Sequence, residues 1–96
     1  ELDSAYRCFE QALSVSRNNN LPRQIAENLY WLGRTQSDRG SADEGIKLLL
    51  DSEELAQGQR NGELLLLLYN ELAVRLEQRG QKDLASGYLK KYTHLR

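Results

Sequence analysis

Tyr30 and Arg34 are the two side chains whose types and spacing could bind another molecule together. Arg34 follows Tyr30 by four positions, so on a helix they lie one turn apart and face the same way. An aromatic ring and a guanidinium can bind a peptide by stacking and by paired hydrogen bonds. The side-chain amide of Asn70 could hold a peptide backbone. A solvated helix face would also tolerate these residues, so peptide binding here is a hypothesis.

The residues that catalysis usually requires are not grouped in this sequence. His94 is the only histidine, so no triad or metal cluster of histidines can form, and a surface position near a helix end explains it. Cys8 has no histidine near it in the sequence and is typical of a small, semi-buried side chain. Neighbouring acids such as Glu53 and Glu54 suit caps and solvated faces. With no phosphate loop, zinc spacing or nucleophile elbow, we expect no enzyme, no metal and no cofactor.

Composition also limits the kinds of partner that we expect. Thirteen basic and fourteen acidic residues among 96 leave a net charge of -1, so no field of one sign attracts nucleic acid or an anionic membrane. The apolar run Leu64–Leu68 is too short to cross a bilayer. A single cysteine fits a reducing compartment, which favours the cytoplasm. The periplasm stays possible if a signal or membrane segment has been removed.

Internal repetition is the strongest signal in the chain. A shift of 40 positions aligns Arg39 with Arg79 and Gly40 with Gly80, and brings other residues of one kind together at helical spacing. These matches include three aspartates (Asp3, Asp43, Asp83), three small residues (Ala5, Gly45, Ala85) and three large apolar residues (Phe9, Leu49, Leu89). Composition alone would scatter such matches, so the chain is interpreted as a repeat.

Each repeat is predicted to be a pair of helices. Ile25, Leu29 and Leu32 step by four and three, and the later copy repeats these steps. Gly40 and Gly80 stand where a left-handed residue ends a helix. The proposed helix starts are Asn20 as an N-cap with Pro22 in the first turn, a capping box of Ser41 and Glu44, and Asn61 as an N-cap.

Five helices follow from these signals, over about 2–17, 21–39, 42–58, 62–79 and 82–95. They form one all-α domain, 1–96, in which 1–20 holds the second helix of a truncated repeat and 21–60 and 61–96 are full repeats. The first helix of the truncated repeat would lie before residue 1, so we expect the chain to be a fragment of a larger protein. Gly33, Ala73, Gly45 and Ala85 are expected where helices cross closely.

The small and large positions resemble those of the tetratricopeptide repeat family. The stretch 26–33 is similar to the opening helix of that repeat, and 40–46 to its turn and second helix. The resemblance implies an open right-handed superhelix of antiparallel helix pairs. The period of 40 exceeds the usual ~34 of the family. Tyr92 departs from the small residues at the matching positions Ala12 and Ser52, which indicates that the last helix ends the array or packs on something beyond it.

By this resemblance the first helices line a concave surface that binds a peptide or protein. Carried over to this sequence, the peptide-binding positions are Glu27, Tyr30, Arg34, Ser37, Asn70, Val74 and Glu77. Trp31 is either a packing residue between helix pairs or part of that surface. The Lys and Asn pair with which the family clamps C-terminal carboxylates is missing, so a chaperone-tail ligand is not expected.

Three functions stay open from the sequence. The first is a protein- or peptide-binding scaffold. The second is a regulatory or sensory input segment of a bacterial signalling protein, ahead of a cyclase, a kinase or a transcription regulator. The third is a homo-oligomerisation module. Leu64–Leu68 covers more than one helix face, so Leu67 or Leu68 should point outward. A neighbouring copy in a homodimer, a partner, or a missing part of the chain in the groove could cover it, and so could ordinary helix packing.

Overall fold

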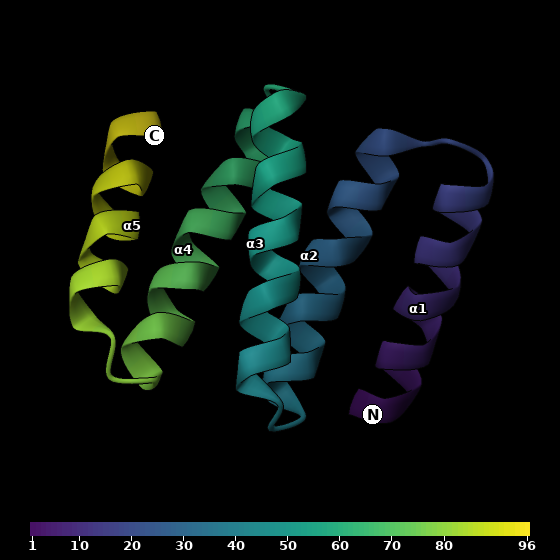
Figure 1. Cartoon of the computed structure of the whole chain (residues 1–96), viewed down its shortest axis with the longest axis horizontal. Helices are drawn as coiled ribbons and strands as arrows, with labels where there is room; N and C mark the ends of the chain where they lie inside the picture. Colours follow the sequence, from purple (N-terminus) through teal and green to yellow (C-terminus); the bar gives the residue numbers. More distant parts are fainter.

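The chain forms five helices and no strand, in a computed structural model that describes residues 1–96 (Figure 1). Each helix begins 20 residues after the previous one, and the predicted boundaries are confirmed to within one residue. The helices are α1 (Leu2–Asn18), α2 (Pro22–Asp38), α3 (Ala42–Gly58), α4 (Gly62–Gln78) and α5 (Lys82–Leu95).

Consecutive helices run antiparallel and lie in an open row, with α1 and α5 at opposite ends (Figure 1). Helices α2 and α4, which are the first helices of the two full repeats, also contact each other directly. The all-α fold of stacked helix pairs is therefore confirmed. No helix has the length and apolar character needed to cross a membrane.

One turn geometry joins all the helices. The N–H of Gly40 donates to the carbonyl of Ser37 at 3.1 Å, and the N–H of Ser41 donates to that of Gln36 at 3.0 Å. This Schellman pair satisfies carbonyls that a helix end leaves free, and it recurs at the other three joints. The residue in the left-handed region is Asn20, Gly40, Arg60 or Gly80, with φ of 52°, 98°, 54° and 80°. The predicted glycines are confirmed.

The predicted N-cap Asn20 and the predicted capping box of Ser41 and Glu44 are both wrong. Asn20 occupies the left-handed position, which asparagine tolerates, and Leu21 is the N-cap of α2. Ser41 is the N-cap of α3 but makes no side-chain cap bond. Its expected partner Glu44 instead accepts a hydrogen bond from Gln36 Nε2 at 2.7 Å, because α2 brings that amide within reach. Pro22 does stand in the first turn of α2.

Asn61 is the one predicted N-cap whose side-chain hydrogen bond forms, since its Oδ1 accepts from the Leu64 N–H at 3.2 Å. We expect Asn61→Ala to lower the free energy of unfolding by about 1 kcal/mol, because a buried donor loses its partner. Ser41→Ala should change the free energy of unfolding by only roughly a few tenths of a kcal/mol, since no cap bond is lost. Urea denaturation followed by circular dichroism compares the two variants, and equal losses would contradict the assigned caps.

Glycines at the α2–α3 crossing let the two backbones approach closely. A Cβ placed on Gly45 would meet Ser37 Oγ and would lie 2.7 Å from the carbonyl oxygen of Gly33. A Cβ on Gly33 would lie 2.7 Å from Leu49 Cγ. The matching positions of the next pair hold Ala73 and Ala85, both buried. The expectation of small residues at these crossings is confirmed.

Apolar side chains form two cores. A small cluster of Leu13, Leu29 and Leu32 joins α1 to α2. The larger cluster runs from α2 to α5, and its most deeply buried side chains include Leu49, Leu68 and Leu72. Within the leucine run, Leu68 is fully buried and Leu67 is 49% exposed. The prediction that one of these two leucines points outward is confirmed.

Candidate functional site

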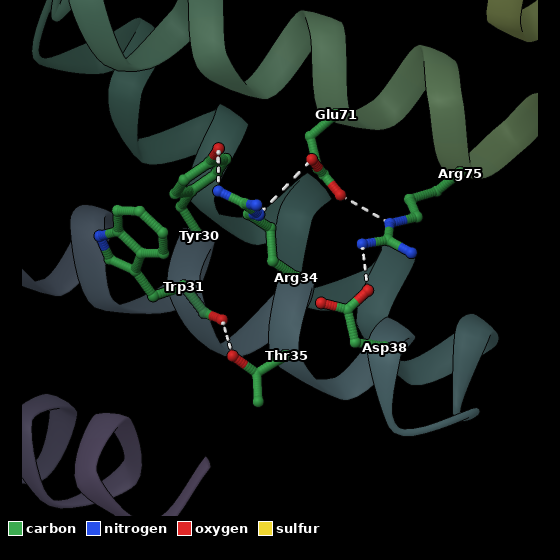
Figure 2. A network of polar contacts seen from close by, with 7 residues as sticks. All are labelled: Tyr30, Trp31, Arg34, Thr35, Asp38, Glu71 and Arg75. Atoms are coloured by element: carbon green, nitrogen blue, oxygen red, sulfur yellow. Dashed lines mark hydrogen bonds and ion pairs between the residues drawn. The ribbon is translucent and has the colours of Figure 1, made fainter. Parts of the chain in front are cut away.

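A chain of polar contacts joins α2 to α4, where the first helices of the repeats lie side by side (Figure 2). Arg34 Nη1 donates to the Tyr30 hydroxyl at 3.4 Å, and Arg34 Nε lies 3.6 Å from Glu71 Oε1. Arg75 Nε donates to Glu71 Oε2 at 2.6 Å, and Arg75 Nη2 donates to Asp38 Oδ1 at 2.7 Å. The network therefore ties α2 to α4 at two points.

Tyr30 does not lie on an accessible surface, which corrects the prediction. Its ring is 3% exposed and belongs to the large core between α2 and α4. Burial raises the pKa of the Tyr30 hydroxyl, and the Arg34 guanidinium opposes that rise without cancelling it. Because α4 covers this side of α2, Tyr30 supports the fold and only its hydroxyl reaches the polar network.

Arg34 is the part of the predicted pair that remains accessible. Its side chain is 39% exposed. The guanidinium carbon lies 5.2 Å from the centroid of the Trp31 ring and 5.8 Å from that of Tyr30. The 3.6 Å contact with Glu71 is loose, and Glu71 has a closer partner in Arg75. The guanidinium could thus turn to an incoming carboxylate without leaving Glu71 unpaired.

Trp31 packs between helix pairs and is still partly accessible. Its ring stacks on Phe9 of α1, with centroids 5.8 Å apart and planes inclined by 12°, and meets the Tyr30 ring edge-on. The packing interpretation is therefore confirmed, but 39% of the residue stays exposed. Phe9 and Tyr30 hold the indole in place beside Arg34, so this aromatic surface is formed before any ligand arrives.

The remaining predicted positions divide between surface and interior. Glu27, Asn70, Val74 and Glu77 are exposed on α2 and α4. The prediction for Ser37 is wrong. Its Oγ is buried without a hydrogen-bond partner and faces Gly45 at the α2–α3 crossing. Three residues beyond Arg34, the helix has turned this side chain toward α3.

Arg75 belongs to the network but was missed from the sequence. Burial by itself would lower its pKa, and the hydrogen bonds to Asp38 and Glu71 outweigh that effect and raise it. Its side chain is 13% exposed between the two carboxylates. Arg75 is therefore a structural cation, whereas Arg34 is the accessible one. The spacing of four residues between Glu71 and Arg75 was the signal that could have revealed the pair.

A second polar cluster links side chains of α5 to Glu53 of α3. The buried carboxylate of Glu53 accepts from the Tyr88 hydroxyl at 2.9 Å, and Lys91 Nζ lies 3.8 Å from its other oxygen. The pKa of the Tyr88 hydroxyl is raised, mainly by burial and to a lesser extent by the hydrogen bond to Glu53. Tyr88 therefore stays protonated and donates, so these contacts orient the last helix.

No group of three or more His, Cys, Asp or Glu side chains is arranged to hold a metal ion. A scan of protein-family models and searches of curated proteins and of solved structures found no match to this chain.

Proposed function

We propose that this chain is a tetratricopeptide-like repeat module that binds a peptide segment of another protein across α2 and α4. The 40-residue repetition and the stacked helix pairs support the family assignment. The observation that carries the binding proposal is the half-exposed pair of Trp31 and Arg34. Tryptophan and arginine are the residue types that contribute most often to binding energy at protein interfaces.

The pair is held ready for a ligand. Trp31 rests on Phe9, and Arg34 lies over the indole ring. Side chains already fixed in this way lose little conformational entropy on binding, which favours affinity. A ligand of matching chemistry has an acidic side chain for the guanidinium and an apolar side chain for the indole.

Acidic residues at the edges of the proposed binding surface set a second requirement for the ligand. Glu27 is exposed on α2 and precedes Arg34 by seven residues, which is about 10 Å along a helix. Glu77 is exposed near the end of α4. A bound segment should therefore carry its acid centrally and a basic residue toward one or both ends. The exposed Val74 and the Asn70 amide offer further contacts along α4.

Selection of binders from a displayed peptide library tests this proposal. Trp31 is the only tryptophan, so its fluorescence reports binding at this surface directly. For the selected acidic peptides we expect Arg34→Ala to weaken binding tenfold or more, with an unchanged melting curve because Glu71 keeps Arg75. Arg17→Ala, at an exposed site on α1, is the matched control and should bind normally. Unaltered affinity in the Arg34 variant would refute the proposed surface.

A further inference from the structure

The chain contains its own example of a helix docked on a helix pair. Ala26 and Tyr30 of α2 and Leu49 of α3 share one core with Leu64, Leu65 and Leu68 of α4. Helix α4 therefore covers one end of the α2–α3 pair. The 40-residue shift carries that covered surface onto the α4–α5 pair, so each position of the covered end has a counterpart at the other end of the molecule.

The counterpart surface is open. Leu49 is fully buried, whereas the matching Leu89 is 47% exposed. Ala26 and Ser52 are fully buried and joined by a hydrogen bond from Ser52 Oγ to the Ala26 carbonyl at 2.6 Å. Their counterparts Leu66 and Tyr92 instead line a hollow of about 420 Å³, together with Glu63, Leu67 and Asn70.

A series of ion pairs stops at the same end. Arg39, at the end of α2, pairs with Asp3 of α1 at 2.9 Å, and Arg79, at the end of α4, pairs with Asp43 of α3 at 2.5 Å. In both pairs the arginine follows the aspartate by 36 residues. Asp83 is the third aspartate of the series, exposed in the first turn of α5, and no basic side chain lies within 4.0 Å of it. A docked helix would complete the series with an arginine at its end.

The open end also differs from the covered one in a way that specifies the ligand. Arg34 faces Glu71 of α4, and Asp38 faces Arg75. The counterparts of Arg34 and Asp38 are Val74 and Gln78, which carry no charge. A helix docked on α4 and α5 should therefore have an apolar residue where α4 has Glu71 and needs no cation where α4 has Arg75.

We propose that the α4–α5 end docks an amphipathic helix of a partner protein, with leucines at positions i, i+1 and i+4, an apolar residue at i+7 and an arginine at i+15. These positions are those of Leu64, Leu65, Leu68, Glu71 and Arg79 in α4. A second copy does not offer this stripe, because the exposed large apolar residues of the chain show this spacing on no helix. The site includes neither Trp31 nor Arg34, and it shares only Asn70 and Val74 of α4 with the peptide surface.

A fluorescein-labelled helical peptide with this pattern, and with Ala, Glu, Lys and Gln elsewhere, tests the proposal by fluorescence anisotropy. We expect saturable binding to the whole chain that Asp83→Lys weakens about tenfold and Leu89→Lys abolishes. A probe with glutamate in place of its arginine should regain its affinity for the Asp83→Lys protein. Such rescue by charge exchange requires direct contact, so a loss of folding could not produce it.

Two control variants show whether binding of the probe is confined to the α4–α5 end. Asp51→Lys, at an exposed acid of α3, should bind the probe normally, and so should Arg34→Ala, which alters the peptide surface. The proposal is overturned if the probe does not bind, or if Asp83→Lys and Leu89→Lys bind it as the unchanged protein does. It is also overturned if sedimentation shows a dimer that Leu89→Lys dissociates, since the occupant is then a second copy.

Discussion

Leu49→Ala will lower the free energy of unfolding by about 4 kcal/mol. Leu49 is fully buried, and its side chain fills the space over Gly33 where α2 and α3 cross. Truncation removes transfer free energy and leaves a cavity that the surrounding helices close only in part, and such changes cost about 2–5 kcal/mol. A domain of this size is typically stable by only about 5–10 kcal/mol. Urea denaturation followed by circular dichroism at about 25 °C measures the loss.

The neighbouring residue is the control for this variant. Leu50 is on the same helix and is 41% exposed, so Leu50→Ala should change the free energy of unfolding by less than about 1 kcal/mol. The pair separates the effect of burial from that of helix propensity, because the chemical change is the same. Similar losses for both variants would contradict the assigned orientation of α3.

The second large effect is expected for Gly45→Ala, which should destabilise the chain by about 2–3 kcal/mol. The added methyl would meet Ser37 Oγ and would come within 2.9 Å of two backbone atoms, the Gly33 oxygen and the Ser37 nitrogen. Backbone cannot move aside as a flexible side chain can, so the helices must separate. That cost exceeds the gain of about 1 kcal/mol from replacing glycine by alanine inside a helix.

Gly87→Ala is the matched control, since a Cβ at Gly87 meets nothing within 4 Å. With no clash, helix propensity alone acts, and this variant should be more stable by about 1 kcal/mol. Thermal unfolding should therefore show shifts of opposite sign for the two glycines. A rise in stability for Gly45→Ala would mean that α2 and α3 do not cross as closely as described.

The elements could be predicted because their signals are local. Apolar steps of three and four residues mark the helices, and Gly40 and Gly80 mark their ends. The 40-residue shift also aligned the aspartates and arginines that pair between the start of one helix and the end of the next. Their pairing itself was not foreseen, because Asp3 and Arg39 meet only after two helices have packed.

The errors arise where one helix meets another. Helical spacing correctly puts Tyr30 and Arg34 on one side of α2, but it cannot tell which part of that side α4 covers, and α4 covers Tyr30. Glu44 lost its expected place in a capping box because Gln36 of the preceding helix competes for its carboxylate. Such partners lie on a different helix, so no local pattern contains them.

The site was predicted in part. The sequence singled out Arg34 and the exposed residues of α2 and α4, and it left open the role of Trp31. It did not foresee that Phe9 supports the indole or that Arg75 joins Asp38 across 37 residues. These contacts decide which cation is free for a ligand, and they follow from the relative placement of α1, α2 and α4.

An NMR titration tests peptide binding most directly. A library-selected acidic peptide is added to the ¹⁵N-labelled chain, and the amide and indole chemical shifts are recorded. If α2 and α4 form the binding surface, the largest changes will fall on the Trp31 indole, the Arg34 side chain and the exposed residues of these two helices, and α1 residues remote from Trp31 will not shift. Changes confined to other helices, with Trp31 and Arg34 unmoved, would contradict the proposed function.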